Sequence, residues 1–181
     1  ANKADFGISV DPDVDRLALI CEDGKAFGEE YTLVSVADYL LSRAYNEALN
    51  TGKSIEEVTA PYQLATSSNL SSSRALRDVT EQYGGEYAAA AVGEVNVTTK
   101  MKECDCIIGG EGNGGVIYPA LHAGRDAMVG VALFLTNVAY KKMKVSELLA
   151  TYPKYVMSKN KIELSDRAVI TKIFDEVKKV Y

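Results

Sequence analysis

The sequence predicts a layered α/β domain in which helices cover both faces of a mixed β-sheet. An N-terminal strand hairpin and a C-terminal linker with a helix are expected to flank it. Stretches with the alternating or continuous apolar pattern of strands alternate along the chain with stretches of helical periodicity. The composition is that of an ordinary globular protein, since 47% of the 181 residues are hydrophobic and 25% are charged.

The first part of the chain predicts a hairpin followed by a long helix. Residues 6–10 alternate apolar with small residues, run into an acidic loop and are followed by the apolar run 17–20. Asp23-Gly24 is a two-residue turn signal. Between residues 29 and 49 the apolar positions fall on one helical stripe, and Thr51-Gly52 ends this helix.

The middle of the chain predicts alternating strands and helices. We expect strands at residues 62–66, 86–92 and 104–108, and helices at residues 74–83, 94–103 and 124–142. Serines 71–73 are expected to cap the first of these helices, and Gly84-Gly85 to end it. The last strand runs into the glycine-rich stretch 109–115.

The pattern and the charge change near residue 145. A short helix at 145–152 with Ser146 as its cap, an extended segment and a final amphipathic helix at 166–181 are expected. Residues 1–140 hold 20 acidic and 10 basic residues, whereas residues 141–181 hold 5 and 10. We therefore expect three parts: the end of a preceding domain (1–30), a complete α/β domain (31–145), and a linker with the start of a following domain (146–181). The chain is expected to be a piece of a longer polypeptide.

Composition limits the chemistry and the partners. A net charge of −5 and the lack of a basic–aromatic motif argue against nucleic acid. The longest nearly apolar stretch, 13 residues, is too short to cross a membrane, and no signal peptide is visible. The three cysteines, Cys21, Cys104 and Cys106, predict reduced thiols in a cytoplasmic protein. The single histidine, His122, excludes a multi-histidine zinc site and is expected to order the turn before the long helix.

The sharpest feature is the run Asp11-Pro12-Asp13-Val14-Asp15-Arg16 between the two N-terminal strands. Three carboxylates this close repel one another unless a positive charge lies among them. Oxygen ligands suit Mg²⁺, and Arg16 adds a fixed positive charge suited to a phosphate group. A solvated acidic turn is the simplest alternative. An EF-hand loop is disfavoured because Arg16 stands where that loop needs glycine.

The stretch Gly109-Gly110-Glu111-Gly112-Asn113-Gly114-Gly115 is the second candidate site. Its glycines permit sharp turns and a close approach to a ligand, and Glu111 and Asn113 can hydrogen-bond vicinal hydroxyls. This is sugar chemistry, although a plain flexible turn has the same composition. A metal–phosphate loop together with a polyol loop indicates a phosphosugar ligand.

At these residues the chain resembles the α-D-phosphohexomutases, the family of phosphoglucomutase, phosphomannomutase and phosphoglucosamine mutase. Residues 11–16 resemble its magnesium loop, and residues 111–115 resemble its sugar-specificity loop. Val92-Gly93 and Gly124-Arg125-Asp126 match pairs that open helices in many members, and the order agrees along essentially the whole chain. Gly115 stands where many bacterial members have histidine, and Ala90 where threonine is common, which points toward mutases of glucosamine or mannose phosphate.

The resemblance implies a role for each matching residue. Asp11, Asp13 and Asp15 would be magnesium ligands, Arg16 would contact the reacting phosphate, and Glu111 and Asn113 would bind the sugar hydroxyls. The chain would cover the end of the second family domain, all of the third and the start of the fourth. The catalytic phosphoserine would lie outside it, so the chain alone would be inactive.

The implied function is a phosphohexomutase that interconverts hexose 6-phosphate and hexose 1-phosphate through a phosphoserine and a bisphosphate intermediate. Its partners would be the hexose phosphate and the remaining domains of the same polypeptide. Two alternatives stay open. One is a haloacid-dehalogenase-type phosphatase with Asp11 as nucleophile and Asp13 as acid, which lacks the expected second acidic cluster. The other is a non-catalytic sugar-phosphate binding module.

Overall fold

The computed structural model describes residues 3–158, 163 and 169–180. An antiparallel hairpin of β1 (Phe6–Val10) and β2 (Leu17–Cys21) opens the chain, as expected. The elements that follow are α1 (Glu29–Thr51), α2 (Ile55–Thr59), β3 (Gln63–Asn69), α3 (Ala75–Gln82), β4 (Glu86–Ala90), α4 (Glu94–Glu103), β5 (Cys106–Glu111), β6 (Gly115–Ile117), α5 (Ala127–Lys141), α6 (Val145–Ala150) and α7 (Val169–Val180).

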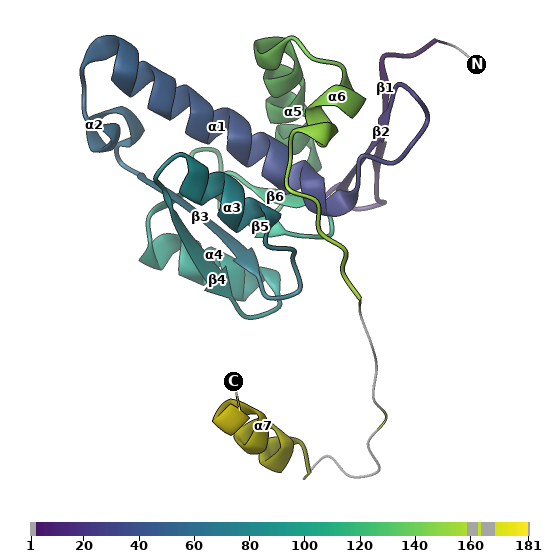
Figure 1. Cartoon of the computed structure of the whole chain (residues 1–181), viewed down its shortest axis with the longest axis vertical. Helices are drawn as coiled ribbons and strands as arrows, with labels where there is room; N and C mark the ends of the chain where they lie inside the picture. Colours follow the sequence, from purple (N-terminus) through teal and green to yellow (C-terminus); the bar gives the residue numbers. More distant parts are fainter. Residues whose placement is uncertain (1–2, 159–162, 164–168, 181) are drawn as a thin grey trace.

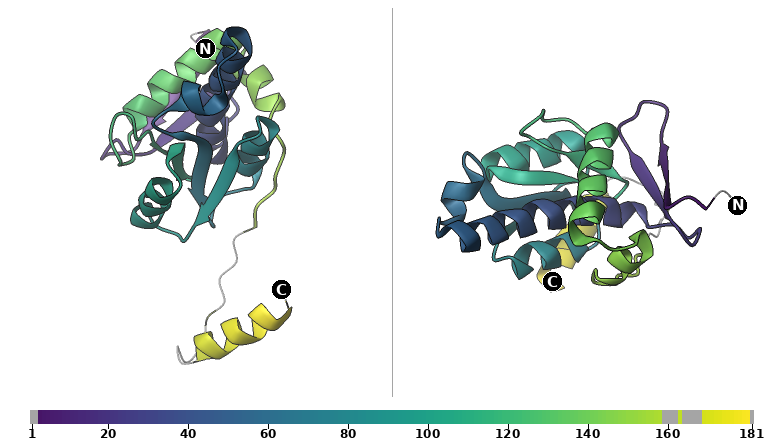
Figure 2. Two further views of the ribbon diagram at one scale, coloured as in Figure 1. Left: turned by 90° about the vertical axis from the view of Figure 1, so that its left-hand side faces the viewer. Right: turned by 90° about the horizontal axis from the view of Figure 1, so that it is seen from above.

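The main sheet has the strand order β4-β3-β5-β6. β3 pairs in parallel with β4 and β5, and β6 is antiparallel to β5, so the sheet is mixed. α1 and α3 pack together over one face, while α4 packs on β3, β4 and β5 from the other (Figures 1 and 2). The layered α/β fold class is therefore confirmed.

The hairpin is fixed to the main domain by aromatic packing. Phe134 of α5 is fully buried and lies edge-on to Phe6 and Phe27, with ring centroids 6.0 and 5.2 Å apart. In Figure 2 the hairpin stands beside α5. Burial of a large aromatic side chain contributes several kcal/mol, and this contact holds the acidic loop against the sheet domain.

Two local expectations were wrong, the end of one strand and the cap of α6, and a third was met only in part. The strand expected to end at residue 108 continues through Gly109, Gly110 and Glu111, because β6 folds back onto it and pairs with these residues. Of the serines expected to cap α3, Ser73 lies one residue before the N-cap residue Arg74, and its hydroxyl accepts the Ala75 amide at 3.4 Å. Ser146 does not cap α6: Lys144 precedes that helix, and the hydroxyl of Ser146, inside it, donates to Glu22.

The C-terminal segment makes few contacts. α7 has no buried residue, and residues 166–168 and 181 of the helix expected there lie outside the described residues, as do residues 159–162 and 164–165 of the preceding segment. All three cysteines are free thiols, as expected. Within the described ranges, none of the helices combines the length and apolar character needed to cross a bilayer.

Candidate metal and ligand site

A tight turn between β1 and β2 gathers the three aspartates. The Val14 amide donates to the Asp11 carbonyl oxygen at 3.1 Å, and Val14 has a φ of 58°. This turn places one carboxylate oxygen of each of Asp11, Asp13 and Asp15 within 4.8 Å of the others. The structure therefore brings together the three residues expected to hold a cation.

Arg16 compensates part of this negative charge. Its Nε donates to Asp11 Oδ2 at 2.6 Å, and the amides of Arg16 and Asp15 donate to Asp11 Oδ1 at 3.0 and 3.2 Å. Partial desolvation alone would raise the pKa of Asp11. The backbone bond and the guanidinium of Arg16 outweigh it and hold that pKa well below its ordinary value. Asp11 is therefore ionised across the physiological range.

Asp15 carries the feature that best fits a cation. Its Oδ2 forms an ion pair with Arg125, whereas its buried Oδ1 lies 3.6 Å from Arg16 Nε and has no hydrogen-bond partner among the described residues. Burial raises the pKa of Asp15 despite the attraction of Arg125. A buried carboxylate oxygen left without a donor, beside two further carboxylates, matches the oxygen donor set that Mg²⁺ prefers. The residues present thus fit a hard divalent cation.

The glycine-rich stretch forms the β5–β6 turn and touches the acidic loop. Gly114, with a φ of 89°, accepts a bond from the Leu17 amide at 3.1 Å, and Gly115 forms a β-bridge with Arg16. A Cβ at Gly114 would lie 2.3 Å from the Leu17 carbonyl oxygen. Only glycine permits this approach, so the two candidate loops lie side by side.

Glu111 and Asn113 occupy different positions around this turn. Asn113 accepts the Gly115 amide through Oδ1 at 3.1 Å. Glu111 is buried, and its Oε1 and Oε2 accept bonds from Asn69 at 2.6 Å and from Arg125 at 2.8 Å. Its carboxylate is therefore buried and bonded on both oxygens, unlike the side chain of Asn113.

Sequence reasoning missed three residues that hold the turn. Asn69 ends β3 and Ser72 accepts the Gly112 amide at 2.8 Å, while Arg125 connects Glu111 to Asp15. Asn69 could have been found, because polar residues at the carboxyl ends of neighbouring parallel strands meet at one sheet edge. The expected strand stopped at residue 66, three residues too early.

A cleft of about 260 Å³ joins the two loops. Asp11 and Arg16 of the acidic loop, Asn113 of the glycine-rich turn and Glu29 of α1 are among the residues that line it. Of the six expected site residues, three thus line one cleft. Asp13, Asp15 and Glu111 are not among its lining residues; Asp13 is exposed, Asp15 half-buried and Glu111 buried.

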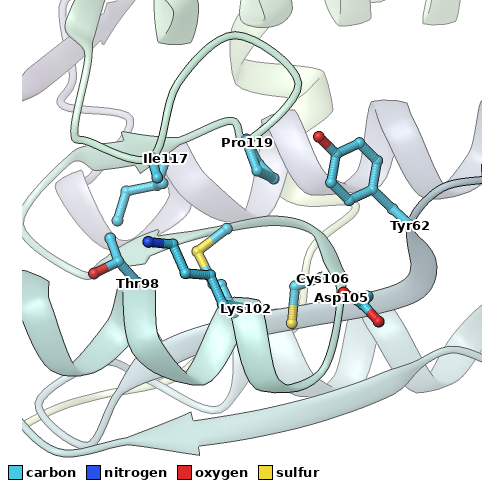
Figure 3. Close-up of a pocket in the computed structure, with 9 residues that line it drawn as sticks. Tyr62, Thr98, Lys102, Asp105, Cys106, Ile117 and Pro119 are labelled. Carbon is cyan, nitrogen blue, oxygen red and sulfur yellow. The ribbon is translucent and has the colours of Figure 1, made fainter.

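A second pocket, of about 140 Å³, lies elsewhere and is mostly apolar (Figure 3). Cys106, the first residue of β5, lines it together with Ile117 and Pro119. Because Glu111 is the last residue of β5, this pocket lies at the opposite end of the strand and is separate from the candidate site.

His122 lies in the turn before α5. Its Nε2 is 3.0 Å from an Asp126 carboxylate oxygen and its Nδ1 accepts the Gly124 amide, so it orders this turn as expected.

Comparison with known proteins gives one consistent family. Residues 30–155 match the family model described as phosphoglucomutase/phosphomannomutase, alpha/beta/alpha domain III. A phosphoglucomutase/phosphomannomutase from Thermococcus kodakarensis is 30% identical over 178 residues, which cover 97% of this chain and 35% of the relative. A phosphoglucosamine/phosphogalactosamine mutase from Sulfurisphaera tokodaii is 27% identical over 180 residues, which cover 99% and 36%.

Solved structures agree with the fold. The crystal structure of Aspergillus fumigatus N-acetylphosphoglucosamine mutase, in complex with GlcNAc-6P and magnesium, matches with a TM-score of 0.69 at 15% identity. The match covers 93% of this chain and 37% of that one. The chain thus spans about a third of the length of the relatives it matches.

Proposed function

Because the chain belongs to the phosphoglucomutase/phosphomannomutase family, we propose that it is part of a phosphohexomutase that interconverts hexose 6-phosphate and hexose 1-phosphate. One observation carries the proposal. The acidic loop with Arg16 and the turn with Asn113 face one cleft, so a metal, a phosphate group and sugar hydroxyls can meet there. The substrate is a hexose phosphate, with glucosamine or mannose phosphate favoured by the names of the relatives.

In this proposal Asp11, Asp13 and Asp15 hold Mg²⁺. The bound ion supplies positive charge that lowers the cost of negative charge building on oxygen during phosphoryl transfer. The guanidinium of Arg16 lines the cleft about half exposed, so it can turn from Asp11 toward a phosphate oxygen. Its bidentate geometry would orient that phosphate beside the acidic loop.

Asn113 and Glu111 are the proposed sugar ligands. Asn113 already lines the cleft, and its amide can donate to one hydroxyl and accept from another. Glu111 is buried and does not line the cleft, so contact with a hydroxyl would require the turn at residues 112–114 to shift. Glycines at 112 and 114 permit that movement.

The phosphoryl donor is proposed to be a serine outside this chain, which acts through a bisphosphate intermediate. Serines 71–73 are poor candidates because they serve the fold: Ser72 contacts Asn69 and Gly112, and the Ser73 amide donates to Glu30. Without that donor serine, the 181-residue chain alone is proposed to have no turnover. We also propose that residues 1–30, 31–145 and 146–181 belong to three successive domains.

The phosphatase alternative has less support. Such an enzyme needs a second acidic cluster after a later strand, and β5 leads instead into a glycine-rich turn whose one carboxylate, Glu111, is buried against Asn69 and Arg125. The matched family is also a different one. A non-catalytic binding module would share the cleft but would turn over no substrate.

A mutase assay on the complete polypeptide tests the proposal. We expect conversion of glucosamine 6-phosphate or mannose 6-phosphate to the 1-phosphate, lost in Asp13→Asn and retained in Asp23→Asn, an exposed aspartate of the neighbouring turn. Wild-type rates in Asp13→Asn would contradict the metal role. Turnover by the isolated 181-residue chain would contradict the placement of the serine.

A further inference from the structure

Arg125 is held rigidly at the start of α5. The next residue, Asp126, caps this helix by accepting the amides of Met128 and Val129. The Arg125 amide and Nε donate to the two carboxylate oxygens of Glu94, each at 3.1 Å. The backbone amide and the Nε of Arg125 are thereby both held by Glu94, next to the capped first turn of α5.

The tip of the same guanidinium joins the two loops of the candidate site. Nη1 donates to Glu111 at 2.8 Å, and Nη2 contacts Asp15. The Arg125 side chain is only 19% exposed, and its Cδ lies 2.4 Å from the position that a Cβ at Gly115 would take. Glycine at position 115 therefore makes room for the arginine, which passes directly over the glycine-rich turn.

We propose that Arg125 is a positioning residue that couples the metal loop to the sugar-binding turn. This inference rests on the proposed function. The guanidinium is planar and its donors are fixed relative to one another, so a movement of Asp15 toward a cation changes the hydrogen bond that Arg125 makes to Glu111. Glu111 in turn accepts a hydrogen bond from the Asn69 side-chain amide. One chain of contacts therefore runs from Asp15 through Arg125 and Glu111 to Asn69.

The loops also touch through the backbone, where Arg16 bridges Gly115. Because Gly115 also pairs with Glu111, the two routes are separated by removing Arg125 and following both loops by nuclear magnetic resonance. The Gly115 amide reports the backbone route, and the Asn69 side-chain amide reports the route through Arg125. The probe is Mg²⁺ alone, titrated into the 181-residue chain.

In the wild-type chain we expect Mg²⁺ to shift both signals with one saturation curve. In Arg125→Met, which keeps the length of the stem, Mg²⁺ still shifts Gly115, but the Asn69 shift falls at least about threefold. Glu94→Gln keeps both bonds at the tip of the guanidinium and should retain the Asn69 shift. Arg77→Met, which removes an exposed ion pair with Glu81 on α3, is the matched arginine control and should change neither.

Two results overturn the coupling: an Asn69 signal that does not respond in the wild type although Gly115 does, or an Asn69 shift of full size in Arg125→Met. If Arg125→Met does not fold, Arg125→Lys replaces it, because one ammonium cannot hold both carboxylates with the planar geometry of the guanidinium, and the same reduction is expected. A wild-type chain in which no signal responds to Mg²⁺ instead refutes the metal role in the proposed function, and the coupling with it.

Discussion

Replacing Gly114 with alanine should separate the two loops of the candidate site. Gly114 has a φ of 89°, and an added Cβ would lie 2.3 Å from the Leu17 carbonyl oxygen. Backbone cannot yield as the end of a flexible side chain can, so the turn must move away from β2. That movement breaks the bond from the Leu17 amide to the Gly114 carbonyl, now 3.1 Å.

The magnitude follows from three contributions. An alanine in the left-handed region costs about 1 to 2 kcal/mol, and alanine recovers about half a kcal/mol by restricting the unfolded chain. The lost hydrogen bond adds about 1 kcal/mol. Displacing the turn from β2 adds about 1 kcal/mol more through lost contacts, so we expect Gly114→Ala to lower the free energy of unfolding by about 3 kcal/mol.

Gly24 provides the matched control. Its φ of 83° is nearly the same, but no atom lies within 4 Å of the position of its Cβ. Gly24→Ala should therefore cost only about 1 kcal/mol, the backbone contribution alone. Urea denaturation followed by circular dichroism measures both values. Equal losses in the two variants would refute the reasoning, because the close approach of the loops would then carry no free energy.

Three further outcomes are expected. Asp38→Ala should lower the free energy of unfolding by about 3 to 5 kcal/mol in urea denaturation. The buried carboxylate of Asp38 accepts hydrogen bonds from Tyr83, Tyr152 and Lys141, and its removal leaves all three donors without this partner. A loss below about 1 kcal/mol would contradict this. Phe134→Ala should cost about 3 to 5 kcal/mol by the same method, since the ring is fully buried between two others, and an unchanged midpoint would count against the packing. Burial raises the pKa of the Cys106 thiol from its ordinary 9.0 to about 12, so above pH 9 the unfolded chain loses this proton before the folded chain does. The free energy of unfolding should therefore fall with rising pH, by up to about 1.4 kcal/mol per pH unit from this group. Cys106→Ala should reduce that slope, and identical pH profiles of the two proteins would exclude the effect.

Much of the fold could be predicted because periodicity reports burial. α4 has the bounds expected from the sequence, and α1 begins at the expected residue and ends next to the predicted Gly52. The alternation along β1 and β2 was likewise sufficient to place the hairpin. In α1, α4 and β2 one side of the element packs on the core, so the local pattern and the tertiary structure agree, whereas Ile8 and Val10 of β1 are exposed.

The errors lie where distant contacts decide. Glycines 109 and 110 lack strand propensity, yet they are in β5 because pairing with β3 and β6 outweighs that preference. Ser146 has the chemistry of a cap but bonds to Glu22, 124 residues away, which no local pattern contains.

The candidate site divides in the same way. The acidic run predicted the cluster of Asp11, Asp13 and Asp15 because its three members are adjacent in sequence and one turn suffices to gather them. Arg125 is 110 residues from Asp15, and nothing in its own neighbourhood indicates that it reaches both loops. The pairing of Glu111 with Asn69 depends on the sheet order, which the sequence leaves open.

Calorimetric titration of Mg²⁺ into the 181-residue chain tests the central claim most directly. Asp13 is the best position to change, because it is the exposed member of the cluster. We expect one Mg²⁺ per wild-type chain, at least about tenfold weaker binding in Asp13→Asn, and wild-type binding in Asp23→Asn. Equal affinity of the wild type and Asp13→Asn would show that the three aspartates do not hold the metal.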